Sequence, residues 1–181
     1  IHFDRKVTLT NTQKKALDKL HVNYFSKYDV KWGSYSIVRA TVDMMEMALD
    51  NPKIGYFHLI SVQGWPLKEP QAIYSRFENN NKIYMNYWRA VDMRKTGEPE
   101  IWWAKYYFNY DQINRRTTLG KIYHRLLLLG QTILRVNKLK KYNIKPEKIY
   151  AGQEWIDIPR DALSYAIEYY EKHLELQKIF S

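Results

Sequence analysis

The spacing of apolar residues along the chain predicts strands that alternate with helices. Apolar side chains recur at helical intervals in residues 38–49 and in residues 119–139. Residues 56–62 form a nearly continuous apolar run between turn residues, which is typical of a strand buried on both faces. Shorter patterns predict strands at 1–3, 28–30, 82–88, 101–107 and 150–158, and helices over 70–77 and from residue 159 onward.

This order of elements indicates the fold class. Strands that alternate with helices predict an α/β layered domain with a central, mostly parallel sheet. The 181 residues suit one domain, and the sequence contains no internal repeat and no low-complexity linker. We therefore expect residues 1–181 to form a single α/β domain.

The composition indicates a folded domain without disulfide chemistry. Hydrophobic residues make up 45% of the chain and include 16 tyrosines, which excludes a disordered chain. The sequence has no cysteine, so thiolate chemistry is excluded and a reducing compartment is indicated. Apolar runs such as 126–129 are far shorter than the ~20 residues that span a bilayer. Residues 1–6 lack the apolar segment of a signal peptide, and we expect a soluble, cytoplasmic domain.

The positive charge is concentrated in one segment. The chain has a net charge of +10, and residues 114–148 hold ten Lys and Arg against one acid, Glu147. Beside the apolar residues 126–129, this charge predicts contact with an anionic membrane surface, at the inner face of the cell membrane. A solvated helix is the alternative. Nucleic acid is disfavoured because Tyr123 and Tyr142 are the segment's only aromatic residues and no nucleic-acid motif is present.

Three stretches of the sequence carry a family resemblance. The first is residues 1–6, IHFDRK; the second is residues 30–40, VKWGSYSIVRA, continued by residues 58–68, HLISVQGWPLK. The third is residues 152–155, GQEW, followed by Ile158 and Arg160. In order and spacing they resemble the Core-2/I-branching β-1,6-N-acetylglucosaminyltransferase family, and the basic segment before the third stretch is typical of bacterial members.

The resemblance implies a fold and a reaction. It implies a GT-A-like α/β/α domain that transfers a sugar, GlcNAc by analogy, from a UDP-sugar to a glycan or lipid-linked glycan acceptor with inversion. It also implies catalysis without a metal or other cofactor. The sequence agrees with that expectation, because it has no D-x-D triplet and its five histidines lack metal-ligand spacing.

The resemblance also assigns donor-binding residues. Asp4 is expected to accept a hydrogen bond from the uridine, and its alternative role is that of a turn residue. Trp32 is expected to border the uracil, with packing against the following helix as the alternative. The complete predicted donor set is Asp4, Trp32, Tyr35, Ser61, Gln63 and Gly64.

The acceptor is expected at Glu154 and Trp155. An inverting transfer needs a base for the acceptor hydroxyl, and Glu154 is the best carboxylate in the chain for that role. Its alternatives are a contact with sugar hydroxyls or a solvated position at the edge of a strand.

The chain departs from the family pattern in two ways. Val62 and Gly64 stand where the family has Gly and Asp, which removes a carboxylate beside the donor. The family's first strand, its Asp-Glu pair with the usual base, and its diphosphate-binding Arg and Lys are not found in residues 1–181, so we expect a sequence truncated at both ends. These departures leave open a non-catalytic member that binds nucleotide sugars or glycans. Charge alone leaves a nucleic-acid-binding domain as a second alternative.

Overall fold

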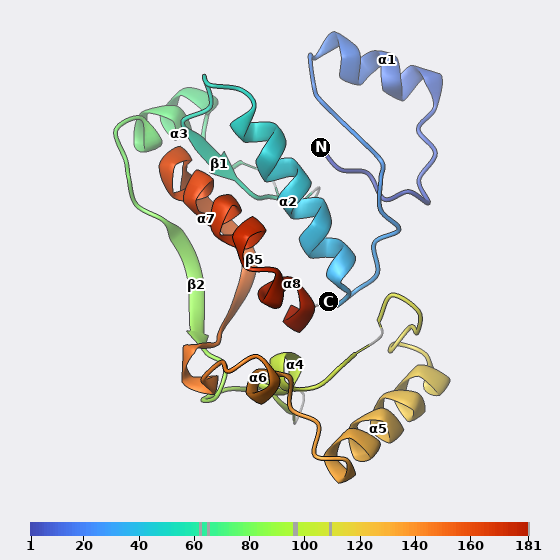
Figure 1. The fold of residues 1–181 in the computed structure, drawn as a ribbon. Helices are drawn as coiled ribbons and strands as arrows, with labels where there is room; N and C mark the ends of the chain where they lie inside the picture. The colour runs from blue at the N-terminus through green and yellow to red at the C-terminus, as the bar shows by residue number, and fades with distance from the viewer. Residues whose placement is uncertain (62, 65, 96–97, 109, 181) are drawn as a thin grey trace. The chain divides into compact units, whose positions relative to one another are not determined.

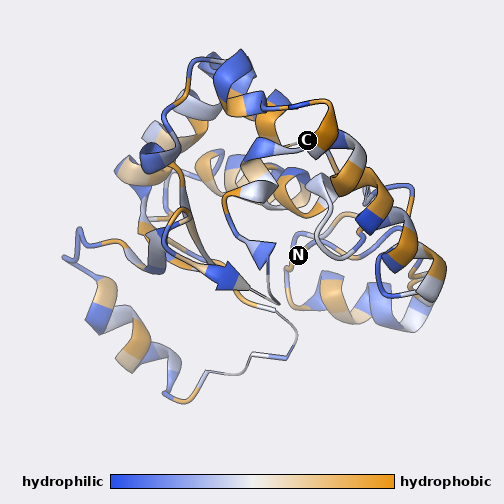
Figure 2. Ribbon diagram, turned by 90° about the horizontal axis from the view of Figure 1, so that it is seen from below, coloured by the Kyte–Doolittle hydropathy of each residue, from blue (hydrophilic) through white to orange (hydrophobic). Residues whose placement is uncertain are grey.

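The computed structural model describes residues 1–181 apart from 62, 65, 96, 97, 109 and 181 (Figure 1). The described chain divides into two compact units. Unit 1 comprises residues 1–44 and 108–135, and unit 2 comprises residues 45–107 and 136–180. Hydrophilic and hydrophobic residues are interspersed along the helices in this view (Figure 2).

The helices are α1 (Asn11–Lys19), α2 (Tyr35–Leu49), α3 (Pro70–Phe77), α4 (Trp102–Lys105), α5 (Thr118–Ile133), α6 (Lys138–Lys141), α7 (Arg160–Lys172) and α8 (Leu174–Phe180), with one 3₁₀ turn at Pro146–Lys148. The strands are β1 (Tyr56–His58), β2 (Tyr84–Arg89), β3 (Arg94–Lys95), β4 (Glu98–Pro99) and β5 (Tyr150–Pro159). The predictions for α2, α3, β2, β5 and α7 are confirmed to within a few residues.

The sheet of unit 2 is antiparallel. Its strand order is β1-β5-β2, and the long central strand β5 runs against both neighbours. The prediction of a mostly parallel central sheet is therefore wrong for the described strands. A continuous apolar run predicts burial but carries no information about strand direction, and β1 ends at His58, earlier than the predicted residue 62.

Two further predictions are corrected. Residues 101–107 are predicted as a strand, but residues 102–105 form the helical turn α4, in which the Lys105 N–H donates to the Ile101 carbonyl. The predicted helix over 119–139 is interrupted, because Arg135 adopts the left-handed conformation with φ 54°. The Asn137 side chain then accepts from the Lys140 N–H and starts a new helix, α6.

Two apolar clusters form the core of unit 2. One joins the end of α2 to β5 and α7 through Ala48, Ile158 and Leu163. The other contains Ala90, Ala104, Leu139, Ile149 and Ile179, from the ends of β2 and β5 and from α4, α6 and α8. Ile179 is fully buried, so the last helix closes this core.

Arg160, the last residue of the third family-like stretch, connects distant parts of unit 2. Its guanidinium donates to the carbonyls of Leu49 at 2.6 Å, Asn51 at 2.8 Å and Ile54 at 3.2 Å. These carbonyls lie at the C-terminal end of α2 and in the turn that leads to β1. Arg160 therefore satisfies helix-end acceptors that would otherwise need water.

Unit 1 contains α1, the first part of α2, and α5. Thr10 and Gln13 form a capping box at the start of α1, and Thr117 caps α5. Its buried side chains include Tyr28, Ala40, Tyr110, His124 and Leu128. The predicted strands at 1–3 and 28–30 are not formed as such, and one parallel bridge pairs His2 with Phe25.

Candidate donor and acceptor sites

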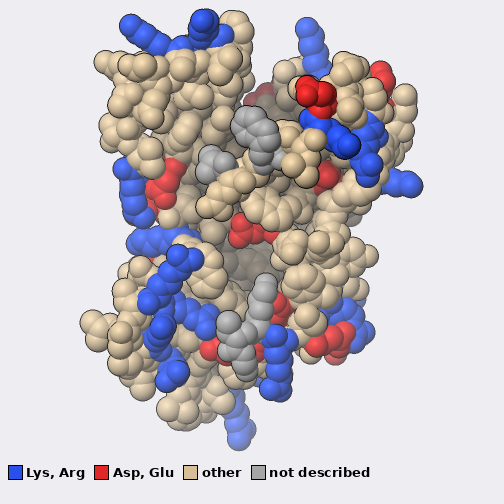
Figure 3. All heavy atoms as spheres, turned by 180° about the vertical axis from the view of Figure 1, so that it is seen from behind, with Lys and Arg blue, Asp and Glu red and all other residues tan. Residues whose placement is uncertain are grey.

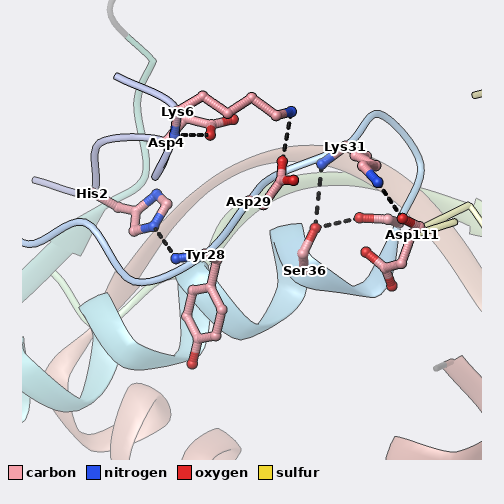
Figure 4. Close-up of polar contacts among 9 residues, drawn as sticks. His2, Asp4, Lys6, Tyr28, Asp29, Lys31, Ser36 and Asp111 are labelled. Carbon is pink, nitrogen blue, oxygen red and sulfur yellow. Dashed lines mark hydrogen bonds and ion pairs between the residues drawn. The ribbon is translucent and has the colours of Figure 1, made fainter. Parts of the chain in front are cut away.

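Two N-terminal segments of unit 1 run side by side and place two carboxylates near one another. The Phe25 N–H donates to the Ile1 carbonyl at 3.0 Å, and the Phe3 N–H donates to the Phe25 carbonyl at 2.9 Å. Asp4 and Asp29 follow these paired segments, and both contact Lys6 (Figure 4). The carboxyl ends of parallel segments are a common position for ligands in α/β proteins.

Asp4 forms a turn and keeps one carboxylate oxygen unused. Its Oδ1 accepts from the Lys6 N–H at 2.9 Å, and its carbonyl accepts from the Val7 N–H at 2.8 Å. Among the described residues, no hydrogen bond reaches Asp4 Oδ2, and the residue is half-buried. The turn therefore holds the carboxylate in place and leaves an acceptor oxygen for another donor.

An ion pair fixes the charge of the neighbouring Asp29. Lys6 Nζ lies 2.5 Å from Asp29 Oδ1. The hydrogen bond from Lys6 lowers the pKa of Asp29, and the same contact raises the pKa of Lys6. Both groups therefore stay charged across the physiological pH range.

Next to this pair, the start of α2 is held by hydroxyl groups. The Lys31 N–H donates to Ser36 Oγ at 3.3 Å, and the hydroxyls of Ser34 and Ser36 are hydrogen-bonded to each other. Lys31 Nζ donates to the backbone carbonyl of Asp111 (Figure 4). These contacts fix the loop that carries Trp32.

Trp32 is an exposed ring with a cationic neighbour. Its relative exposure is 57%, and the Arg116 guanidinium lies 5.4 Å from the ring centroid. Tyr35 is half-buried at the first position of α2. The roles of Trp32 and Tyr35 toward uracil stay predictions.

In unit 2, Glu154 and Trp155 lie in a β-bulge. Gly152 is paired with Tyr87 and Ile156 with Met85, so three residues of β5 stand opposite Asn86 alone. Glu154 is exposed, and no hydrogen bond or ion pair to its carboxylate is present among the described residues. Bulges redirect side chains out of the regular alternation and are frequent beside active sites.

Gly152 is required by this bulge. A Cβ atom at this position would lie closer than 3.0 Å to the Asn86 carbonyl oxygen, a contact that needs backbone movement. The glycine that begins the third family-like stretch therefore permits a close approach of two strands.

The other predicted donor residues form a turn after β1. The Gly64 N–H donates to the Ser61 carbonyl at 2.9 Å, and the Gln63 N–H donates to Ser61 Oγ at 3.3 Å. Because the Leu59 N–H donates to the Ile156 carbonyl, this turn and the bulge lie at the same end of the β1–β5 pair. The Val62 departure from the family pattern lies outside the described residues.

A cavity of about 930 Å³ opens beside β1 and α3, and no sequence pattern predicted it. Tyr56 and His58 on β1 stack at 5.3 Å between ring centroids, and Phe77 on α3 lies 4.5 Å from His58. Tyr74 is an exposed ring of the same cavity, and residues 79–81, all Asn, lie at its rim. Aromatic faces with nearby amides are suited to a ligand with both apolar and polar faces, and a saccharide is one such ligand.

His58 is oriented within this cavity by a partner on β5. Its Nδ1 lies 2.8 Å from Asp157 Oδ1, across the register of the β1–β5 pair. The sequence signal that could have revealed the cavity was alternation on β1, Tyr56 and His58, together with Tyr74 and Phe77 three residues apart on α3.

Comparison with known families decides the assignment. A sequence model of the Core-2/I-branching enzyme family matches residues 1–99, more than half of the chain. This chain belongs to the Core-2/I-branching enzyme family. No curated protein and no solved structure match it.

The Core-2/I-branching enzymes are a family of glycosyltransferases, so this chain belongs to a glycosyltransferase family. The family uses a nucleotide-sugar donor and a glycan acceptor in general. The match includes Asp4, the Trp32 loop and the turn at Ser61. The bulge with Glu154 lies beyond the matched residues, so its assignment rests on the third stretch alone.

In the described ranges, no three His, Cys, Asp or Glu side chains are grouped so that they could hold a metal ion. Metal-independent catalysis stays a prediction from the sequence. Within the same residues, no helix combines the length and apolar character needed to cross a membrane.

Proposed function

We propose that this member of the Core-2/I-branching enzyme family transfers GlcNAc from UDP-GlcNAc to a glycan or lipid-linked glycan acceptor, with inversion and without a metal. The observation that carries the donor half is the free Oδ2 of Asp4, held by its turn beside the Lys6–Asp29 pair. A uracil or ribose donor group satisfies this oxygen. The Trp32 loop lies in the same unit and supplies an exposed ring.

Cations near these groups suit the charge of a diphosphate. Lys31 is anchored through its backbone N–H and its ammonium, and Arg116 lies over Trp32. Positive groups held in place before the reaction stabilise the negative charge that develops on a departing nucleoside diphosphate. We propose that these cations contribute that stabilisation within unit 1.

The acceptor half of the proposal rests on the bulge of β5. The acceptor hydroxyl oxygen attacks the anomeric carbon as the bond from that carbon to the UDP oxygen breaks, and UDP leaves with the bonding electrons. Glu154 is proposed to take the hydroxyl proton or, short of that, to orient the hydroxyl by a hydrogen bond. Its exposed carboxylate and its position in the bulge support either role. The reaction is proposed to take place in the cytoplasm.

Binding of UDP to the 181-residue chain tests the donor half. In a thermal-shift assay, UDP and UDP-GlcNAc are expected to raise Tm, because a ligand of the folded state stabilises it by mass action. Asp4→Asn is expected to reduce the shift, and Asp18→Asn, an exposed aspartate of α1, serves as the matched control. Equal shifts with UDP, GDP and ADP, or no effect of Asp4→Asn, would contradict the assignment of Asp4 to uridine.

A further inference from the structure

The α5 helix presents an apolar stripe on its exposed face. The stripe consists of five residues spaced alternately three and four apart: Leu119, Ile122, Leu126, Leu129 and Ile133. Their relative exposures run from 50% at Ile122 to 80% at Leu119. Contiguous exposed apolar surface on a soluble domain marks a contact with another molecule or with a membrane.

The opposite face of α5 is already packed on its own unit. Gly120, His124, Leu128 and Gln131 are buried. His124 Nδ1 lies 3.1 Å from the Tyr110 hydroxyl, and its ring is stacked on Phe108 at 5.5 Å. At roughly 100° per residue, this buried face is on the other side of the helix from the stripe. Rotation of α5 to bury the stripe would therefore break the packing of unit 1.

The surroundings of the stripe are positively charged. Residues 112–135 contain five cations and no carboxylate: Arg115, Arg116, Lys121, Arg125 and Arg135. Lys121 and Arg125 are one turn apart on α5 and flank the stripe on one side. Among the described residues, neither side chain takes part in an ion pair. Figure 3 shows Lys and Arg side chains gathered in its lower half, where some Asp and Glu side chains also lie.

Charge decides between two partners for this stripe. A spacing of three and four also fits a second copy of α5. A second copy would bring the same cations together without a carboxylate to offset them. An anionic lipid surface supplies the opposite charge and accepts leucine and isoleucine side chains at the boundary between headgroups and acyl chains.

We infer that α5 binds flat on an anionic lipid membrane, with the apolar stripe inserted and Lys121 and Arg125 at the level of the headgroups. The helix has 16 residues and is therefore about 24 Å long, which suits an in-plane helix. A glycosyltransferase attached in this way meets lipid-linked acceptors at the surface where they reside.

Vesicle flotation of the 181-residue chain tests this inference. Binding is expected to vesicles of phosphatidylcholine with 30% phosphatidylglycerol, and to be several-fold weaker to phosphatidylcholine alone. The double substitution Leu126→Ser/Leu129→Ser is expected to lower the partition coefficient by about tenfold or more, since each buried CH₂ contributes ~0.8 kcal/mol. Lys121→Glu/Arg125→Glu is expected to abolish the preference for phosphatidylglycerol.

Matched controls keep the test specific. Leu20→Ser/Leu174→Ser removes two similarly exposed leucines elsewhere, and Lys14→Glu/Lys15→Glu reverses two charges on α1. Both control variants are expected to bind like the wild type, and circular dichroism verifies that every variant is folded. Unchanged flotation of the Leu126→Ser/Leu129→Ser variant would overturn the inference. A dimer that this variant converts to monomer, without vesicle binding by the wild type, would assign the stripe to a second copy.

Discussion

At the scale of single residues, Lys138 is unusual because its ammonium is buried in unit 2. Lys138 is 2% exposed, its Nζ donates to the Ile179 carbonyl, and it lies 5.0 Å from the centroid of the Tyr107 ring. Burial lowers the pKa of Lys138 to about 8 from its usual 10.5. Lys138 therefore loses its proton at a lower pH in the folded protein than in the unfolded chain.

This lowered pKa makes the stability of unit 2 depend on alkaline pH. Between pH 8 and 10.5 the unfolded chain binds the Lys138 proton more tightly than the folded chain, so the free energy of unfolding rises with pH in this window. The contribution is at most about 1.4 kcal/mol per pH unit. Urea denaturation at pH 7.5, 9 and 10 is expected to show that Lys138→Met loses this rise relative to wild type.

Lys140→Met is the control for this measurement, because Lys140 is exposed on the same helix, α6. It should keep the pH dependence of the wild type. Parallel stability curves for wild type and Lys138→Met across the window would mean that the amine is not buried as described.

Glu154→Gln separates acceptor contact from donor binding. The substitution keeps the shape of the side chain and removes its charge and its capacity as a base. We expect a loss of ~10²–10⁴ in kcat if Glu154 is the base, and a raised acceptor KM if it only binds hydroxyls. The assay uses UDP-GlcNAc with methyl glycosides of galactose, GalNAc and GlcNAc as acceptors.

Glu171→Gln, an exposed glutamate of α7, is the matched control for Glu154→Gln. The UDP-induced rise in Tm is expected to be the same in both variants and in the wild type. A variant at Glu154 that transfers GlcNAc as fast as the wild type, with an unchanged acceptor KM, would remove Glu154 from the acceptor site.

Sequence motifs located candidate residues but did not reveal their surroundings. The turn at Asp4 followed from its position after a short apolar stretch, whereas the Lys6–Asp29 ion pair joins residues that no motif relates. The cavity beside β1 was also not predicted from the sequence, because Tyr56 and Phe77 contact one another only after β1 and α3 pack. Contacts between distant segments depend on tertiary structure, and local patterns do not encode them directly.

At the scale of elements, two glycines of α5 are predicted to respond in opposite ways. A Cβ atom at Gly120 would lie closer than 3.0 Å to the Asn114 carbonyl oxygen, whereas a Cβ atom at Gly130 has no neighbour within 4 Å. Gly120→Ala should therefore lower the free energy of unfolding by about 1–3 kcal/mol. Gly130→Ala should raise it by about 0.5–1 kcal/mol, through helix propensity.

Urea denaturation of the two alanine variants measures this difference, and the wild type is the reference. The two substitutions are chemically identical and lie in one helix, so a general effect of alanine on helix propensity cancels between them. Stabilisation by Gly120→Ala would show that the loop at Asn114 is not packed against the start of α5.

Helices were predicted from the sequence more reliably than the sheet. The apolar spacing of α2 and α5 is local, and both helices follow it, although the prediction for α5 runs past Arg135. The strand prediction for residues 101–107 was wrong because the run of Ile, Trp and Ala fits the period of a strand as well as that of a helix. Burial of Ala104 and Tyr106 favours the helical turn. The bulge at Glu154 was also not predicted from the sequence, since it depends on the register between β5 and β2.

At the scale of the whole molecule, the proposed reaction predicts donor binding without a divalent metal. The prediction rests on the lack of a D-x-D triplet in the sequence. The rise in Tm caused by UDP should be the same in EDTA as with Mg²⁺ or Mn²⁺. Loss of the shift in EDTA, with recovery on addition of Mn²⁺, would show a metal-dependent donor site.

The central strand of the sheet, β5, is synthesised after both of its neighbours. This order delays folding of the sheet during translation. β1 and β2 do not pair with each other, and each pairs only with β5 within the described sheet. Pro159, the end of β5, follows Arg89, the end of β2, by 70 positions. At ~5–20 residues per second on a ribosome, β2 remains without its sheet partner for on the order of 4–14 s. Over that interval the nascent chain exposes apolar strands that a chaperone can bind, and unit 2 folds only once its last third has been made.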